Sequence, residues 1–351
     1  MTPSLPVRTA GTLALAFGAS VLCLWLRTPL PWVLGPLVAT AVVSVLGAPT
    51  ASWTPLRNAG QWVIGAVLGL YFTPQVTALV GRLWWAVLLS IAWSLVLGWL
   101  FGRWLGHAVR GRLEGTPQQQ RATSYFAGAI GGASEMTLLA ERAGARTDLV
   151  AAAHSLRLLI VTITIPVALA WSGLHGLDPT QPGARVVDPG GLALLALATG
   201  AGCWLLARTG RANPWFIGAL LVAMGLTMAD VTLSAVPQSL TNAAQLVIGV
   251  SLGVRFRREF VHTAPLWLLA VAAGTVVMLV VCALFGAGLG WLAGLHPATM
   301  VLGTSPGGIA EMAITAKVLQ LGVPVVTAFQ VCRLVAVLVL LEPLHRHGWL
   351  R

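Results

Sequence analysis

Six polar side chains stand inside apolar stretches of this sequence, where they could bind a substrate or an ion. They are Glu135, His154, Arg157, Glu311, Gln330 and Arg333. An arginine can hold a carboxylate through two parallel hydrogen bonds, and a glutamate at membrane depth is costly enough to require a partner. The six residues therefore allow capture of a small anion together with a proton or a cation. Ion pairs that merely join two parts of the protein are the alternative interpretation.

The two glutamates belong to a stretch that occurs twice. It contains Gly131-Gly132-Ala133-Ser134-Glu135-Met136 in the first copy and Ser305-Pro306-Gly307-Gly308-Ile309-Ala310-Glu311-Met312 in the second. Glycine permits positive φ and proline removes a backbone donor, so each copy predicts a helix break. Half-helices should restart over 133–143 and 309–319, and their free N-terminal N–H groups would favour an anion. A packing-driven kink in a continuous spanning helix is the alternative.

Further polar residues could line the same pathway. They are Ser134 and Ser305 beside the glycines, and two duplicated amide pairs, Asn58 with Gln61 and Asn242 with Gln245. The members of each amide pair are three residues apart, so they share one face of a helix. Amides inside membrane helices commonly form hydrogen bonds between helices. The amide pairs could therefore equally hold helices together or line the pathway.

The composition indicates that the folded chain is surrounded by lipid. Of the 351 residues, 57% are hydrophobic and only 9% are charged, whereas a soluble domain carries about 25% charged residues. Apolar runs of about 20 residues recur along the chain, which predicts an all-α polytopic protein in the lipid bilayer. The net charge of +11 comes from arginines beside these runs. No basic cluster is interleaved with aromatics, so direct nucleic-acid binding is not expected.

The chain consists of two related halves. Asn58-Ala59-Gly60-Gln61-Trp62-Val63-Ile64-Gly65 matches Asn242-Ala243-Ala244-Gln245-Leu246-Val247-Ile248-Gly249 at an offset of 184, and Glu135 matches Glu311 at an offset of 176. Proline and glycine are frequent in the break between the halves. The sequence therefore predicts a first membrane repeat at 1–175, a linker at 176–189 and a second membrane repeat at 190–351.

Basic residues in the connecting loops predict how the halves cross the membrane. If all six apolar segments of each half crossed, the two sides would carry nine and ten basic residues. If the fifth segment enters and leaves on one face, fifteen lie on one side and four on the other, as the positive-inside rule requires. We expect two inverted repeats, each with about five spanning helices and one re-entrant or broken segment. Both termini should lie in the cytoplasm, below a bacterial inner membrane.

The duplicated NAxQxVIG block, followed by GGxxEM and an arginine-bearing segment, resembles the AbrB family of bacterial integral membrane proteins. The resemblance covers nearly the whole chain and implies a multi-pass protein with a duplicated domain. Members are labelled as regulators of gene expression or as ammonia monooxygenases. Among the seven histidines only His345 and His347 are close in sequence. No metal-ligand pattern thus supports the enzyme label, and we expect neither catalysis nor a bound metal or cofactor.

These residues favour a secondary transporter, because inverted repeats with broken segments and intramembrane charges are typical of alternating access. Its substrate would be a small metabolite, anionic if the arginines bind it, moved with protons or sodium. A membrane-embedded regulator that changes gene expression indirectly is the second hypothesis, and an ammonia monooxygenase is the third. The expected partners are the bilayer, the substrate and the coupling ion, and assembly of several copies stays open.

Overall fold

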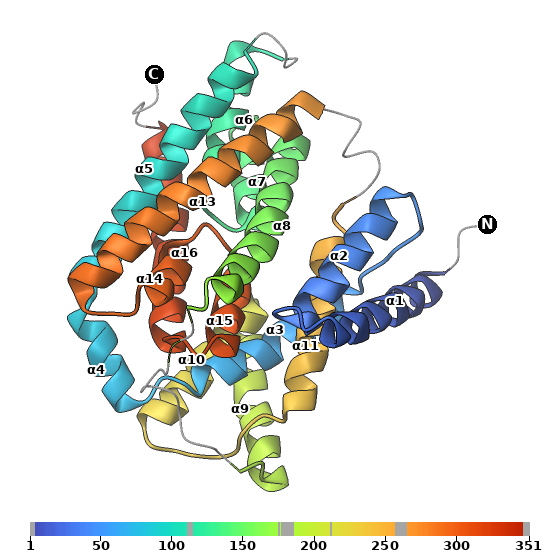
Figure 1. The fold of residues 1–351 in the computed structure, drawn as a ribbon, viewed down its shortest axis with the longest axis vertical. Helices are drawn as coiled ribbons and strands as arrows, with labels where there is room; N and C mark the ends of the chain where they lie inside the picture. Colours follow the sequence, from blue (N-terminus) through green and yellow to red (C-terminus); the bar gives the residue numbers. More distant parts are fainter. Residues whose placement is uncertain are drawn as a thin grey trace. The chain divides into compact units, whose positions relative to one another are not determined.

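The computed structural model describes residues 4–110, 115–174, 176, 186–210, 213–256 and 265–346, and the side chains of Ser134, Glu135 and residues 338, 342, 345 and 346 lie outside this description. Every regular element in these ranges is a helix (Figure 1). The helices are α1 (Leu5–Trp25), α2 (Pro31–Val45), α3 (Thr54–Gly69), α4 (Pro74–Arg82), α5 (Trp84–Ala108), α6 (Pro117–Gly128), α7 (Ala133–Arg142), α8 (Thr147–Trp171), α9 (Pro189–Ala207), α10 (Pro214–Met228), α11 (Gln238–Gly253), α13 (Pro265–Ala293), α14 (Pro297–Thr304), α15 (Ile309–Val318) and α16 (Val323–Arg346).

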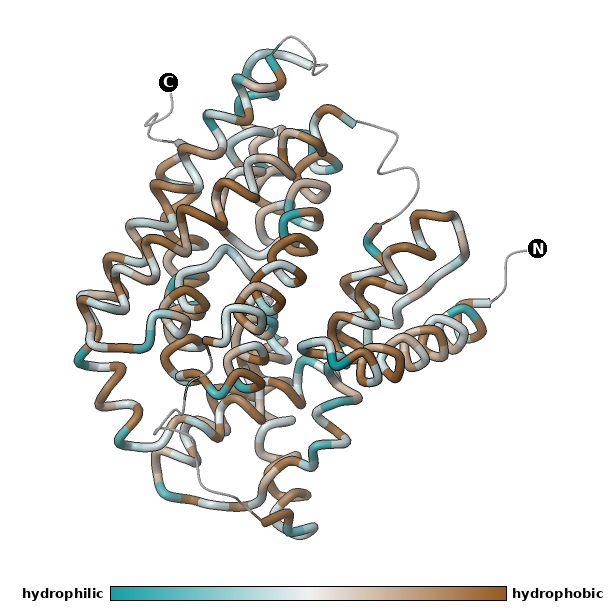
Figure 2. The backbone as a smooth tube through the Cα atoms, viewed as in Figure 1, coloured by the Kyte–Doolittle hydropathy of each residue, from teal (hydrophilic) through white to brown (hydrophobic). Residues whose placement is uncertain are grey.

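Six described helices are long and apolar enough to cross a membrane, namely α1, α5, α8, α9, α13 and α16. A seventh crossing is added if the bent pair α3 and α4 forms one span, and α2 and α10 are shorter apolar helices. Figure 2 shows apolar residues along most of these helices. The chain is therefore a polytopic α-helical membrane protein, as its composition predicts. The expected number of about ten crossings stays a prediction.

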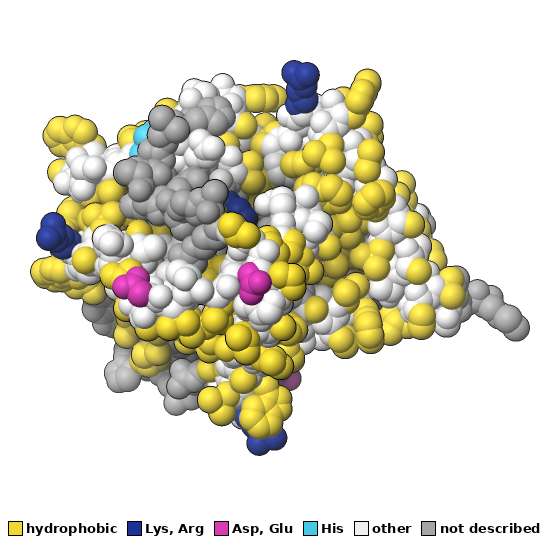
Figure 3. Space-filling model, turned by 90° about the horizontal axis from the view of Figure 1, so that it is seen from below, with side chains coloured by type: hydrophobic (Ala, Val, Ile, Leu, Met, Phe, Trp, Pro, Cys, Tyr) yellow, Lys and Arg dark blue, Asp and Glu magenta, His cyan; other side chains and the backbone are white. Residues whose placement is uncertain are grey.

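The surface carries large apolar side chains that a water-soluble protein would bury. Trp171, Trp291 and Trp25 are 85%, 80% and 78% exposed. Figure 3 shows hydrophobic side chains over much of one face, with single charged groups between them. Contiguous exposed apolar surface of this kind marks contact with a membrane or another protein, and together with the apolar helices it indicates lipid.

The apolar residues between 54 and 82 form two helices. α3 ends at Gly69, α4 begins at Pro74 and the two helices are bent by 87°. Proline lacks a backbone N–H and is tolerated in the first turn of a helix but not in its interior. Pro74 therefore starts a new helix. The apolar character of the segment gives no sign of this bend.

The chain forms two compact units, and each unit contains helices from both sequence repeats. The first unit comprises Met1–Arg82, Pro166–Arg258 and Ala313–Pro324, so it holds α1–α4, α9–α11, the end of α8 and most of α15. The second comprises Leu83–Ile165, Glu259–Met312 and Val325–Arg351, so it holds α5–α7, most of α8, α13, α14, the start of α15 and most of α16. The predicted boundaries at 175 and 190 divide the chain by repeat and stay a prediction. Most of the predicted linker lies outside the described residues.

Glycines allow helices of the first unit to pack at very short distance. A Cβ on Gly65 of α3 would clash with the carbonyl O of Phe216 in α10, and one on Gly249 of α11 would lie 2.7 Å from the carbonyl O of Val33 in α2. Gly69 and Gly253, four residues further on, make the corresponding close approaches. Small residues four apart are the usual packing motif of membrane helices. Glycines that correspond in the two sequence repeats therefore make corresponding helix–helix contacts, α3 with α10 and α11 with α2.

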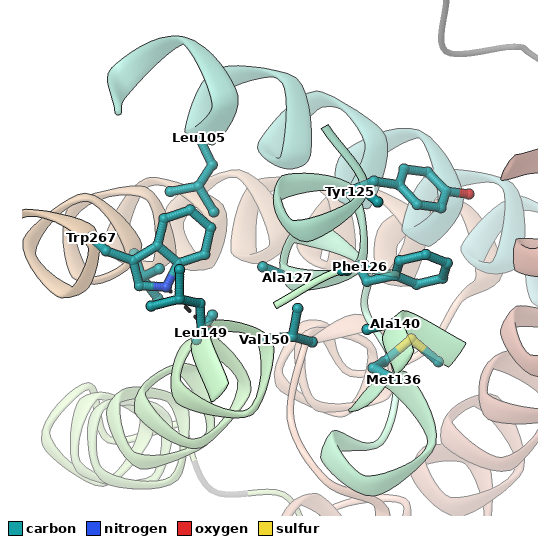
Figure 4. Close-up of a cluster of buried hydrophobic side chains, with 14 of the residues drawn as sticks. Leu105, Tyr125, Phe126, Ala127, Met136, Ala140, Leu149, Val150 and Trp267 are labelled. Atoms are coloured by element: carbon teal, nitrogen blue, oxygen red, sulfur yellow. Dashed lines mark hydrogen bonds between the residues drawn. The ribbon is translucent and has the colours of Figure 1, made fainter. Parts of the chain in front are cut away.

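The second unit has an apolar core that joins α6 and α7 to the long helices α5, α8, α13 and α16 (Figure 4). Phe126 of α6 and Met136 of α7 are fully buried together with Leu149 of α8 and Trp267 of α13. The indole Nε1 of Trp267 donates to the carbonyl O of Leu149 at 3.1 Å. The long helices thus hold the two short helices α6 and α7 in place.

Candidate functional site

Both duplicated glycine stretches break their helices. In the first copy α6 ends at Gly128 and α7 begins at Ala133, and in the second α14 ends at Thr304 and α15 begins at Ile309. The restarted helices cover 133–142 and 309–318, which confirms the predicted half-helices to within one residue at their ends. Neither copy is a continuous helix, and whether each broken segment crosses the membrane stays a prediction.

The reason predicted for the glycines is wrong. None of the glycines in the two breaks has positive φ, and Gly132 has φ −67° and ψ 140°, which any residue adopts. The glycines instead leave room for a methionine that follows five residues later. A Cβ on Gly131 would lie 2.7 Å from Cε of Met136, and one on Gly307 would lie 2.8 Å from Cγ of Met312. The side chain of each methionine thus folds back over its break.

The helices α6 and α7 form a hairpin. After α7, the backbone N–H of Arg146 donates to Oγ1 of Thr123 in α6 at 3.0 Å. A ten-residue helix is about 15 Å long, so a helix that continued in the direction of α6 would carry Arg146 far from Thr123. The chain therefore returns toward the start of α6. Sequence reasoning missed Thr123, although Thr299 at the offset of 176 was an available signal.

Arg157 of α8 is buried against the C-terminal end of α6, with 3% of its surface exposed. Its Nη1 donates to the carbonyl O of Ala127 at 3.2 Å, and its Nη2 donates to that of Ala129 at 2.7 Å. Its Nη2 also lies 2.6 Å from Nδ1 of His154, one turn earlier on α8. The last carbonyls of a helix have no partner within the helix, so the guanidinium group caps α6.

Arg333 of α16 caps α14 in the same way and is 4% exposed. It donates to the carbonyl O of Ser305 and, from Nη2, to that of Gly307 at 2.9 Å. Its Nη2 also donates to Oε1 of Gln330 at 2.6 Å, and Nε2 of Gln330 donates to the carbonyl O of Leu302 at 2.7 Å. The guanidinium group and the amide together provide hydrogen-bond donors for the backbone carbonyls at the end of α14.

The two caps match residue by residue at the offset of 176. Arg157 corresponds to Arg333, His154 to Gln330, and the acceptors Phe126 and Ala129 correspond to Leu302 and Ser305. The second unit thus brings together both duplicated glycine stretches and all four polar residues predicted on α8 and α16.

Of the two predicted glutamates, the structure describes the side chain of Glu311 but not that of Glu135. Glu311 is 8% exposed in the first turn of α15, and its Oε2 lies against Gly308 at the start of that helix. A carboxylate there interacts favourably with the positive end of the helix dipole. The side chains of Glu135 and Ser134 lie outside the described residues. The predicted cluster of two glutamates and two arginines therefore stays a prediction.

The duplicated amides lie in the first unit. Asn58 and Gln61 are half-buried on α3, and Gln245 is buried on α11. A Cβ on Gly60 would lie 3.1 Å from the carbonyl O of Ala244, which is its own counterpart at the offset of 184. The amide pairs therefore flank a close contact between α3 and α11. Asn242 accepts a hydrogen bond from Gln238 one turn earlier, at 2.8 Å.

In the part of the chain that the structure describes, no three histidine, cysteine, aspartate or glutamate side chains gather in a group that could hold a metal ion. The described site is instead built from two buried arginines, their neutral neighbours and the carbonyls of two broken helices. It belongs to the second unit.

Fold and site together define a polytopic helical membrane protein with a duplicated broken helix, each copy capped by a buried arginine. A family model described as Transition state regulatory protein AbrB matches residues 32–348. This match covers most of the chain, including both broken helices. The chain belongs to the AbrB family.

Two relatives are similar over nearly their full length. YhjN, an uncharacterized protein of Bacillus subtilis (strain 168), is 24% identical over 340 residues, which cover 90% of this chain and 86% of YhjN. A protein of Escherichia coli (strain K12), named "Putative regulator AbrB", is 25% identical over 348 residues, which cover 95% of this chain and 94% of the relative. The similarity therefore spans both repeats.

Proposed function

We propose that this AbrB-family protein is a secondary transporter that moves a small metabolite across a bacterial inner membrane by alternating access. The observation that carries the proposal is the matched pair of broken helices, α6–α7 and α14–α15, whose breaks lie in one compact unit. Non-helical backbone in a membrane is tolerated only inside protein or beside a water-filled cavity. In secondary transporters such broken helices bind the substrate and the coupling ion.

Charge favours an anionic substrate. Arg157 and Arg333 place two positive charges beside the breaks, and the N-cap residue of α7 is Gly132, which has no side chain to cap the helix. The Nε–H of Arg333 is buried and has no hydrogen-bond partner among the described residues. Helix N-termini and guanidinium groups both bind carboxylates and phosphates. A small oxyanion would complete these interactions.

Glu311 is the candidate for ion coupling. Its carboxylate is nearly buried and lies at the start of α15, beside the break. A buried carboxylate can exchange a proton or coordinate a sodium ion, and ionisable residues in membrane segments mark such pathways. Binding of a cation there would offset the negative charge of a substrate during transport.

Flux through the purified protein in liposomes tests the proposal. Radiolabelled small carboxylates should accumulate when a proton or sodium gradient is imposed, and empty liposomes should show none of this uptake. Glu311→Gln keeps the shape of the side chain but not its charge, so it should abolish the dependence on the gradient. Absence of uptake for every carboxylate and gradient, with correctly folded protein, would reject the transporter proposal.

The proposed topology follows from the distribution of arginine. With α6–α7 and α14–α15 as re-entrant segments, the two repeats would be inverted, and both termini would lie in the cytoplasm. The hydrogen bond from Arg146 to Thr123 supports this for the first repeat, because it brings both ends of the α6–α7 segment together. The proposed membrane is the inner membrane.

A regulator that acts indirectly on gene expression is the second candidate. The name of the Escherichia coli relative and the description of the family model favour it. Such a protein needs a soluble partner, and the arginine-rich stretch 103–121, which contains the end of α5, the connection and the start of α6, is the longest basic segment proposed to face the cytoplasm. Crosslinking from this connection in cells should then capture one defined protein, and a transporter without a signalling partner should give none.

A further inference from the structure

His154 joins Arg157 to the last turn of α6 through both of its ring nitrogens. Nη2 of Arg157 lies 2.6 Å from Nδ1, and Nε2 lies 2.8 Å from the carbonyl O of Phe126. A guanidinium group only donates hydrogen bonds, and a carbonyl oxygen only accepts them. Both contacts are satisfied together only when Nδ1 carries no proton and Nε2 carries one. The ring is therefore neutral and held in one tautomer.

Gln330 makes the same two contacts with an amide. Its Oε1 accepts from Arg333 at 2.6 Å, and its Nε2 donates to the carbonyl O of Leu302 at 2.7 Å and to that of Ser305 at 3.1 Å. His154 is 2% exposed and Gln330 is fully buried, so water does not replace these bonds. The glutamine amide offers an acceptor oxygen and an NH2 group with two donors, and it does not titrate. The neutral histidine is equivalent to it.

We infer that His154 is a positioning residue, a neutral bridge that orients Arg157 against the broken end of α6, and that it does not carry protons. A second ring proton would remove the acceptor for Arg157 and place a positive charge against the guanidinium group. Proton coupling in the proposed transporter therefore belongs to another residue. The inference depends on the proposed function only for its flux measurement.

Exchange of the two side chains tests the equivalence. His154→Gln and Gln330→His each keep an acceptor for the arginine and a donor for the carbonyl of the broken helix, so flux should stay within about threefold of the wild type. His154→Phe and Gln330→Met keep the approximate shape but form neither hydrogen bond. These two controls should lower flux by roughly tenfold or more, and should lower the midpoint of thermal unfolding by roughly 3–10 °C.

Nitrogen NMR of protein with ring-¹⁵N histidine gives a readout that does not depend on transport. The signals that vanish in His154→Gln belong to His154. Nδ1 should resonate as an unprotonated nitrogen and Nε2 as a protonated one. A doubly protonated ring or the opposite tautomer would overturn the inference.

Loss of flux in a stable His154→Gln protein would also overturn it, because a side chain with an acceptor and a donor but no titrating group would then not replace His154. If the wild-type protein moves no substrate, the proposed function fails, while the NMR signals and the unfolding midpoints still decide the role of His154. The two failures are therefore distinguishable.

Discussion

At the scale of single residues, the two buried arginines bind backbone carbonyls. The carbonyls at the end of a helix lack partners within it and carry about half a negative charge in sum. Arg157 and Arg333 donate hydrogen bonds to these carbonyls at the ends of α6 and α14, and their positive charge offsets the negative end of each helix dipole. A guanidinium group is planar and offers five donors, so one side chain can satisfy several carbonyls of an irregular turn. Lysine cannot match this geometry.

Removal of either guanidinium group should therefore destabilise the protein strongly. Arg157→Ala and Arg333→Ala each leave several buried carbonyls without a donor, at a cost of about 1–3 kcal/mol for each unsatisfied group. We expect each variant to lose about 3–5 kcal/mol of unfolding free energy. Arg157→Lys and Arg333→Lys should recover only part of it. Denaturant unfolding of the detergent-purified protein measures the difference.

Arg146 provides the matched control. Its guanidinium group pairs with Asp148 at 2.6 Å, but the two side chains are 30% and 54% exposed. Such exposed pairs contribute about 0–1 kcal/mol. Arg146→Ala should therefore change stability little. Equal losses for Arg146→Ala and Arg157→Ala would contradict the capping role.

Gly307 and Gly308 should respond differently to the same substitution. A Cβ on Gly307 meets the buried side chain of Met312 at 2.8 Å, whereas one on Gly308 meets the carboxylate Oε2 of Glu311. Gly307→Ala should cost about 1–3 kcal/mol through overpacking. Gly308→Ala should move the carboxylate and reduce coupled flux, with a change in stability of no more than about 1 kcal/mol.

Unfolding midpoints and liposome flux, measured on the same preparations, separate the two effects. Gly288 on α13 has nothing within 4 Å of an added Cβ, so Gly288→Ala is the neutral comparison for both measurements. Normal coupled flux in Gly308→Ala would show that the position of the Glu311 carboxylate is not part of transport.

At the scale of elements, the sequence predicts features that depend on neighbouring residues, such as helix breaks, and misses those that depend on tertiary contacts, such as the arginine caps. Both helix breaks and the half-helices that follow them were predictable, because glycine and proline act within their own segment. The caps were not, because the acceptors of Arg157 and Arg333 are backbone carbonyls that leave no residue signature. The bend between α3 and α4 was not predicted, although Pro74 marks the start of α4. The left-handed backbone expected for the glycines is absent.

Close helix packing in the first unit yields a test at this scale. Gly65→Ala and Gly249→Ala put a Cβ against the backbone carbonyls of α10 and α2, which cannot move without shifting a helix. Each should cost about 1–3 kcal/mol of unfolding free energy. Gly225→Ala, on α10 with nothing within 4 Å of the added Cβ, should gain about 0.5–1 kcal/mol. Thermal unfolding in detergent ranks the three variants.

At the scale of the whole molecule, each compact unit combines helices from both repeats. A repeat is therefore not a folding unit by itself, because α3 of the first repeat packs on α10 of the second, and α11 of the second packs on α2 of the first. The sequence alone locates the repeats but does not predict that helices of one repeat pack on helices of the other, because this packing depends on contacts between segments that are distant in the chain. Separate expression of residues 1–175 should accordingly yield no stable membrane protein.

The topology of the whole chain depends on whether α6–α7 crosses the membrane or returns. In a background without Cys23, Cys203, Cys282 and Cys332, single cysteines at the exposed positions His107 and Glu141 report the two ends of this segment. Arg146 lies beside Thr123 after α7, so both cysteines should react with an impermeant maleimide from the cytoplasmic side. Arg82→Cys, before α5, should react only from the opposite side. Labelling of Glu141→Cys from the side of Arg82→Cys would mean that the segment crosses, and the inverted arrangement of the repeats would then be wrong.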